Sequence, residues 1–151
     1  MPSLREVYNN VYNDVLDGIV DELVKYIKEL MKEKVESEVY DRYDPTGEAR
    51  YERRMENGGL SDIRNYSHTI KLDGNTATIN IYNDTEIAKG EDYLDEYIIE
   101  GKYNWRNSEI YKMQPYPRDF IGAVMNDIKN NKSVRRMLES KLKNKGIKLL
   151  D

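Results

Sequence analysis

The sequence predicts an α+β fold: a long N-terminal helix, a small antiparallel sheet built on a central hairpin, and two C-terminal helices. Three observations predict it: an apolar stripe at helical spacing over residues 1–40, strand-like alternation on both sides of a glycine turn, and two short amphipathic stretches near the C-terminus. A chain of 151 residues fits a single domain, 1–151. Within it we expect an α+β core over residues 48–128 and a basic C-terminal helix and tail over residues 133–151.

The N-terminal helix is predicted over residues 3–39. Ser3 and Glu6 can form a capping box, in which each side chain bonds an otherwise unpaired backbone N–H. Apolar residues then recur at three- and four-residue steps, which places them on one stripe of a helix about 55 Å long: Leu4, Tyr8, Val11, Val15, Ile19, Leu23, Ile27 and Leu30. A helix of this length should project beyond the domain or pack against a partner. The alternative is a helix-turn-helix broken near Gly18, because glycine costs about 1 kcal/mol relative to alanine.

The middle of the chain carries a clear hairpin signal. Ile70 and Leu72 alternate with polar residues, Asp73-Gly74 turns the chain, and a second alternating run follows with Ala77, Ile79 and Ile81. Residues 93–99 are predicted as a short helix or strand that ends at Glu100-Gly101.

Two helices are predicted after this core. Pro117 suits the first turn of the first one, because its missing N–H is harmless there. Phe120, Val124 and Ile128 should face inward from that helix. Ser133 is expected to cap the last helix, and its apolar face consists of Val134, Met137, Leu138 and Leu142. Gly146 stands where a left-handed residue commonly ends a helix, with Ile147 placed for the accompanying hydrophobic contact.

Composition favours a soluble product of a reducing cytosol. The chain is 38% hydrophobic and 34% charged, and it has no cysteine, no apolar run long enough for a membrane helix and no signal-peptide pattern. Residues 1–48 hold 6 basic and 12 acidic side chains, and residues 129–151 hold 8 basic and 2 acidic. These opposed ends could attract one another within a molecule or between subunits. Two ordinary solvated helix faces are the other interpretation.

No strong catalytic motif is present, so we expect a protein that is not an enzyme and uses no metal or cofactor. His68 has no cysteine or second histidine as a partner, and we place it near the start of the first hairpin strand. One enzymatic alternative is a Mg²⁺-dependent nuclease of restriction-endonuclease type, with Asp84 upstream of Glu100-Gly101-Lys102. A small acidic inhibitor-like binding protein is a further alternative, suggested by the acidic N-terminal helix.

The order of motifs from residue 50 to 128 resembles the neck and tail-completion proteins that join head to tail in long-tailed bacteriophages. The resemblance rests on an arginine-bearing segment, a glycine-leucine turn before the hairpin, a tyrosine-containing helix, a Glu-Gly pair and a proline-phenylalanine start of a late helix. In this chain these are Arg50-Tyr51-Glu52-Arg53-Arg54, Gly58-Gly59-Leu60-Ser61-Asp62-Ile63, the Ile70–Ile81 hairpin, Tyr93–Ile99, Glu100-Gly101 and Tyr116-Pro117-Arg118-Asp119-Phe120-Ile121.

The resemblance implies a structural virion protein, made in the bacterial host cytoplasm and placed at the neck or tail top. It would form a homo-oligomeric ring, of six or twelve subunits, that contacts neighbouring connector and tail proteins and no membrane. DNA would pass through the channel without specific binding. The acidic N-terminal helix would face the channel or a neighbour, because an acidic lining does not hold phosphates.

A ring requires two different complementary patches on each subunit. The basic C-terminal helix is expected to contact the acidic side of the next subunit through Arg135, Arg136 and Lys141. Large aromatic residues dominate interface energetics, so we expect further anchors among the 13 tyrosines and the tryptophan: Tyr97, Trp105, Tyr111 and Tyr116. The alternative for these four is that they cover the small sheet.

Overall fold

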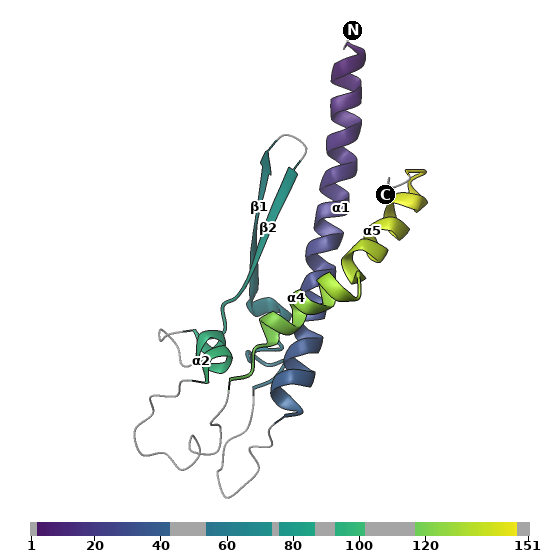
Figure 1. Ribbon diagram of the computed structural model, residues 1–151. Coiled ribbons are helices and arrows are strands. Elements are labelled where there is room, and N and C mark those ends of the chain that lie inside the picture. The colour runs from purple at the N-terminus through teal and green to yellow at the C-terminus, as the bar shows by residue number, and fades with distance from the viewer. Residues whose placement is uncertain (1–2, 43–53, 74–75, 87–92, 102–116, 148–151) are drawn as a thin grey trace, which may run out of the picture.

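The fold is α+β, as predicted, and its layout is shown in Figure 1. The computed structural model describes residues 3–42, 54–73, 76–86, 93–101 and 117–147. The elements are, in chain order, helix α1 (Leu4–Val35), a π-helical turn (Glu36–Tyr40), a 3-10 turn (Ile63–Asn65), strands β1 (Tyr66–Asp73) and β2 (Thr76–Asn83), and helices α2 (Leu94–Glu100), α4 (Phe120–Asn130) and α5 (Ser133–Asn144).

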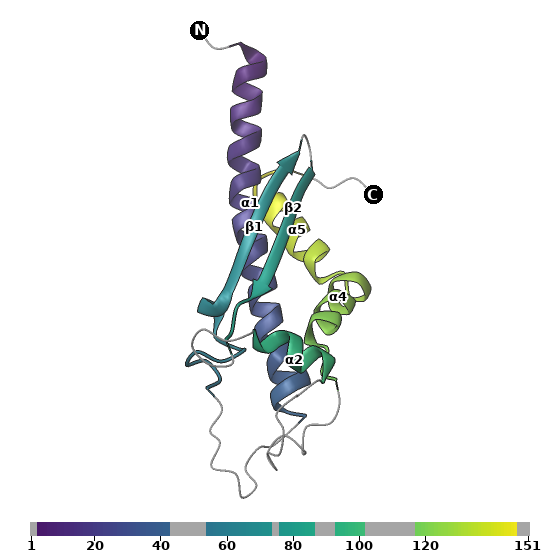
Figure 2. The same cartoon turned by 90° about the vertical axis from the view of Figure 1, so that its left-hand side faces the viewer.

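Helix α1 is continuous, so the predicted long helix is confirmed and the break at Gly18 is wrong. Its 32 residues span about 48 Å at 1.5 Å per residue. Gly18 is tolerated because the residues that follow it, Ile19 and Val20, are buried and hold this stretch in place by packing. The N-terminal part of the helix projects beyond the rest of the described protein, as Figures 1 and 2 both show.

The buried face of α1 differs in part from the predicted stripe. Ile19 and Leu30 are buried, whereas Leu23 and Ile27 are only partly covered. The most buried positions on the helix are Met31 and Val35, with Val24 and Val20 on the same side. The reason is geometric, because a run of four-residue steps advances about 40° each time and drifts around a 3.6-residue helix. The predicted side chains before residue 17 lie outside the described part of the chain.

The central hairpin lies at the predicted position, but Asp73, which was predicted in the turn, is the last residue of β1 and pairs with Thr76. Strands β1 and β2 pair antiparallel without interruption from Tyr66↔Asn83 to Asp73↔Thr76. Ile70 pairs with Ile79 and Leu72 with Ala77, so the apolar residues of both strands share one face. The described sheet has these two strands, and its base is anchored by Tyr66 and Asn83, which are 3% exposed each. His68 lies within β1, with an exposed side chain.

The ends of the later helices correct two predictions. Pro117 lies before α4 rather than in its first turn, and the helix is capped by Asp119, whose carboxylate accepts a hydrogen bond from the Gly122 N–H at 2.7 Å. Ser133 is the first residue of α5 and not its cap, since the preceding Lys132 adopts a left-handed conformation and provides no side-chain cap.

The C-terminal end of α5 is a Schellman motif, as the position of Gly146 predicts. Gly146 has φ +75°, its N–H bonds the Lys143 carbonyl at 3.0 Å, and the Ile147 N–H bonds the Leu142 carbonyl at 2.9 Å. Ile147 is 43% exposed, so the expected apolar contact is at most partial. Residues 93–99, predicted as helix or strand, form α2, which ends at the left-handed Gly101.

The core lies where the C-terminal part of α1 meets the base of the hairpin, α2 and α4. Its fully buried centre is formed by Val35, Leu60 and Phe120, each at most 2% exposed. Ile98 from α2 and Val124 from α4 complete it. Helix α5 continues from α4 and returns along α1, which it contacts directly. Its four predicted inward residues are only partly buried.

Candidate assembly surface

Helix α5 lies against α1 of the same chain, and an ion pair joins the two helices. The Lys141 ammonium is 3.2 Å from a Glu22 carboxylate oxygen, and both side chains are a little less than half exposed. The Lys145 side chain reaches the same stretch of α1, next to Gly18. The opposite charges of the two ends therefore attract within one molecule at this point, which is one of the two possibilities that the charge asymmetry raised.

The outer face of α5 carries a second set of cations. Arg136 and Lys143 are separated by seven residues, so they lie on one strip of the helix, and Lys132 directly precedes its first residue. All three are exposed. Arg135 lies beside this strip and pairs with Glu139 one turn later, at 2.9 Å. We call Lys132, Arg136 and Lys143 the basic strip. It is directed away from the Lys141 side of the helix, because Lys141 is about half a turn from Arg136.

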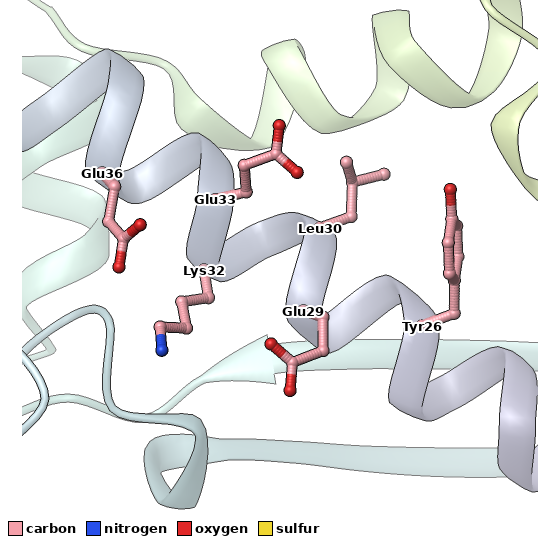
Figure 3. Close-up of a pocket in the computed structure, with 6 residues that line it drawn as sticks. All are labelled: Tyr26, Glu29, Leu30, Lys32, Glu33 and Glu36. Atoms are coloured by element: carbon pink, nitrogen blue, oxygen red, sulfur yellow. The ribbon is translucent and has the colours of Figure 1, made fainter.

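An acidic face runs along the described part of α1. Asp17, Asp21, Glu29 and Glu33 are all exposed, and the exposed Lys25 interrupts their row between Asp21 and Glu29. A hollow of about 330 Å³ lies on this surface. It is lined by Lys32 and by three glutamates of α1 and of the turn that follows it, Glu29, Glu33 and Glu36 (Figure 3). Lys32 pairs with Glu56, which raises the pKa of its ammonium. We call Glu29 and Glu33 the acidic pair, since no ion pair to either is found among the described residues.

The glycine-leucine motif of the family resemblance forms the support of the hairpin. Gly58 has φ +87°, and a Cβ on Gly59 would lie 2.6 Å from the backbone N and O of Met55, so only glycine fits there. The Leu60 side chain is buried, and its carbonyl accepts hydrogen bonds from the Tyr66 hydroxyl at 2.6 Å and from Asn83 Nδ2 at 3.0 Å. The motif thus ties both strands to the core.

The Glu-Gly pair and the proline-phenylalanine pair meet at the far side of the same core. Gly101 has φ +66° and ends α2 directly after Glu100. Pro117 precedes Arg118, whose N–H bonds the Ile98 carbonyl of α2 at 3.0 Å. Phe120 is fully buried. The resemblance motifs are therefore mainly residues that build the core.

A polar cluster beside Leu60 was not singled out by sequence reasoning. The Asp62 carboxylate accepts hydrogen bonds from the Gly58 N–H at 2.7 Å and from Arg64 Nη2 at 2.6 Å. The Arg64 guanidinium and these backbone bonds hold the pKa of Asp62 well below its usual range. Thr85 Oγ1 donates to the Gly59 carbonyl at 3.2 Å. The sequence carries one indication of this cluster: an aspartate two residues before Arg64 can form an Asx turn, in which its side chain accepts a hydrogen bond from the Arg64 backbone N–H.

The predicted aromatic anchors lie mostly outside the described residues. Trp105, Tyr111 and Tyr116 fall within 102–116, and only the backbone of Tyr97 is placed, within α2. Of the predicted basic anchors, Arg135 and Arg136 are exposed on α5, whereas Lys141 is held by Glu22.

The residues of the nuclease alternative are placed only in part. Asp84 directly follows β2, Glu100 ends α2, and Lys102 lies outside the described residues. Near them, Asp95 is half-buried, and burial raises the pKa of its carboxyl. Within the described ranges, no group of three or more His, Asp and Glu side chains is arranged to hold a metal ion. In the same ranges, no helix has the length and apolarity needed to span a bilayer.

Comparison with known proteins gives a single type of match. A family model described as YomN matches residues 3–144, which is nearly the whole chain and includes every described element. Neither the curated proteins nor the solved structures contain a match to this chain.

Proposed function

The chain belongs to the YomN family, which is phage-related, and on that premise we propose that it is a structural subunit of a tailed bacteriophage particle. It forms a ring of six or twelve copies at the neck or tail top and joins the head to the tail, with no chemistry of its own. Its neighbours are the connector and tail proteins above and below, and DNA passes through the ring without specific binding. It acts in the virion after synthesis in the host cytoplasm.

The observation that carries the proposal is the presence of two different, oppositely charged surfaces on one subunit. The basic strip of α5 and the acidic pair of α1 are both exposed, and each lies on a different helix. A head-to-tail contact needs two unlike, complementary patches, and repetition of such a contact gives a ring when the rotation closes. Charge complementarity also suppresses wrong pairings.

The length and exposure of α1 support the same role. The helix extends past the hairpin and past the end of α5 (Figure 2), so its N-terminal part has neighbours on few sides within the described protein. A long helix that overhangs its own domain is suited to packing against an adjacent subunit, since most helix stability in proteins comes from tertiary contacts.

The test uses two complementary charge reversals. Arg136→Glu with Lys143→Glu reverses the basic strip, and Glu29→Lys with Glu33→Lys reverses the acidic pair. Each variant alone places like charges at the contact, so we expect loss of ring assembly. In a ring formed from a mixture, the two variants can alternate. Every second contact then joins the reversed basic strip to the reversed acidic pair, and the remaining contacts join the unchanged basic strip to the unchanged acidic pair. Opposite charges meet at every contact, so assembly should return.

Assembly is measured by light scattering and electron microscopy of purified protein, and by incorporation into phage particles produced in the host. Lys71→Glu on the exposed hairpin is the control for a change of net charge, and it should leave assembly unchanged. Rings that form normally with either double variant, or a mixture that fails to assemble while both variants are folded, would overturn the proposed contact.

The nuclease alternative has a separate test. It requires Mg²⁺-dependent cleavage of DNA by the purified protein that disappears on Glu100→Ala. Cleavage with these properties would replace the structural role with an enzymatic one.

A further inference from the structure

The outer edge of β2 is a long strand edge that carries neither charged residues nor prolines, although α1 contacts this strand. One side of β2 pairs with β1 over eight residues, and no further strand of the described protein pairs with its other side. Exposed edges are normally blunted by charges, prolines or bulges, because an open row of N–H and C=O groups can bind another strand. Strand β1 carries His68, Lys71 and Asp73. Strand β2, Thr76–Asn83, has no charged residue, no proline and no bulge in its pairing with β1.

The polarity of β2 is symmetric about Ile79. Ala77 and Ile81 flank it on the apolar face of the hairpin, and Thr78 and Asn80 flank it on the polar face. If two β2 strands pair antiparallel with Ile79 opposite Ile79, then Ala77 faces Ile81 and Thr78 faces Asn80. Apolar residues then meet apolar residues across the whole contact. A shift by one residue would place every apolar side chain opposite a polar face, so this register is favoured.

The apolar face of the hairpin also lacks cover toward its tip. Ile70 is 38% exposed and Leu72 is 52% exposed, although both belong to the face that turns inward at the base of the hairpin. Isolated two-stranded sheets are marginal in water, whereas sheets of three or more strands with an apolar face are stable. Pairing at β2 would make a four-stranded sheet with one continuous apolar face.

We infer that the outer edge of β2 binds β2 of a second copy of this chain, antiparallel about Ile79. Because the contact joins the same surface of both copies, it is a two-fold contact that closes on itself. It is independent of the proposed ring, whose contacts join two different surfaces. The two contacts use separate elements, β2 here and the helices α1 and α5 there, so either can fail without the other.

The register gives a charge test. Thr78→Lys with Asn80→Lys places lysines opposite lysines at two positions of the contact, and the two-fold assembly should be lost. Thr78→Lys with Asn80→Asp places a lysine of one copy opposite an aspartate of the other at both positions, and the two-fold assembly should be kept. All substituted side chains are exposed on the polar face. Thr78→Lys places a lysine opposite Lys71 of the same hairpin, and this cost to the monomer is the same in both variants. Circular dichroism checks the fold of each variant.

The matched control places the same two lysines on β1, as Ser67→Lys with Thr69→Lys, also exposed on the polar face. Mass is measured by light scattering from about 1 μM to 1 mM, which covers weak and moderate affinities. The measurement is made in about 1 M sodium sulfate, where the charges of the proposed ring contact are screened. There we expect twice the chain mass of 17.8 kDa for the wild type, the control and the variant with Thr78→Lys and Asn80→Asp. The variant with Thr78→Lys and Asn80→Lys should have the mass of a single chain. A wild-type monomer throughout, an unaffected Lys/Lys variant, or equal loss in the control would each overturn the inference.

Discussion

Asp62 shows how a single buried carboxylate organises the turn that supports the hairpin. It is 4% exposed because the Arg64 side chain covers it, while Arg64 itself is open to solvent. The carboxylate accepts the Gly58 and Arg64 backbone N–H groups, which fixes the loop between the glycine pair and the 3-10 turn. In the same place Tyr66 is buried, and burial raises the pKa of its phenol, so it remains a neutral hydrogen-bond donor to Leu60.

Substitution of this carboxylate should change the response of stability to pH. Because the folded-state pKa of Asp62 is depressed, its contribution is present above the ordinary pKa of 3.8 and is lost as the pH falls below it toward the folded-state pKa. Asp62→Asn should lower the free energy of unfolding at neutral pH by roughly 1–3 kcal/mol, with the lower part of the range expected because Arg64 faces solvent.

Urea unfolding at pH 7 and at pH 3 measures both effects. The difference between wild type and Asp62→Asn should shrink at the lower pH, where the wild-type carboxylate begins to lose its advantage. An equal difference at the two pH values would show that the ionised form of Asp62 adds nothing to stability.

At the scale of elements, α5 is held to α1 mainly by partly exposed contacts. None of the described residues of α5 is fully buried, and the ion pair of Lys141 with Glu22 joins the two helices. Helices attached in this way open more readily than the core, because few buried apolar contacts resist local unfolding.

Reversal of one partner in that ion pair should loosen α5. Glu22→Lys and Lys141→Glu should each speed hydrogen exchange of the α5 amides, and the combination of both should restore much of the protection. The coupling should not exceed about 1 kcal/mol, since the pair is solvent-exposed. Arg135→Glu with Glu139→Arg is the matched control, because that pair lies within α5. Full additivity of the two single changes would remove the ion pair as a docking contact.

At the scale of the whole molecule, the two proposed contacts differ in physical character and should respond oppositely to salt. The ring contact joins exposed charges, which are screened as the Debye length falls from about 10 Å at 0.1 M to about 3 Å at 1 M salt. The β2 contact joins uncharged strands with apolar side chains, and it should persist or strengthen in sulfate salts.

Light scattering at several concentrations of sodium sulfate distinguishes them. We expect large assemblies to be lost first and a species of two chains to remain. Large assemblies that survive at high salt would show that the ring does not depend on the basic strip and the acidic pair. A single chain at high salt would argue against the β2 contact.

Local sequence determined the elements of this protein. The long helix, the position of the hairpin, the left-handed Gly146 and the α+β class all follow from periodicity and turn chemistry, which are short-range properties. The register of the hairpin, which pairs Ile70 with Ile79, did not follow from the predicted Asp73-Gly74 turn. Helix boundaries were less well predicted, because Asp119 caps α4 while Pro117 lies before the helix, and Ser133 does not cap α5. Capping depends on backbone conformations that residue type alone does not specify.

Only the tertiary structure decided which residues meet. It placed Lys141 on Glu22 of its own chain, selected Val35, Leu60 and Phe120 as the centre of the core, and assembled the Asp62 turn beneath the hairpin. Each of these pairs residues that are distant in the chain or depends on the exact rotation of a helix. Such contacts are set by the packing of whole elements against one another, and no local pattern encodes the angle at which a 32-residue helix presents its faces.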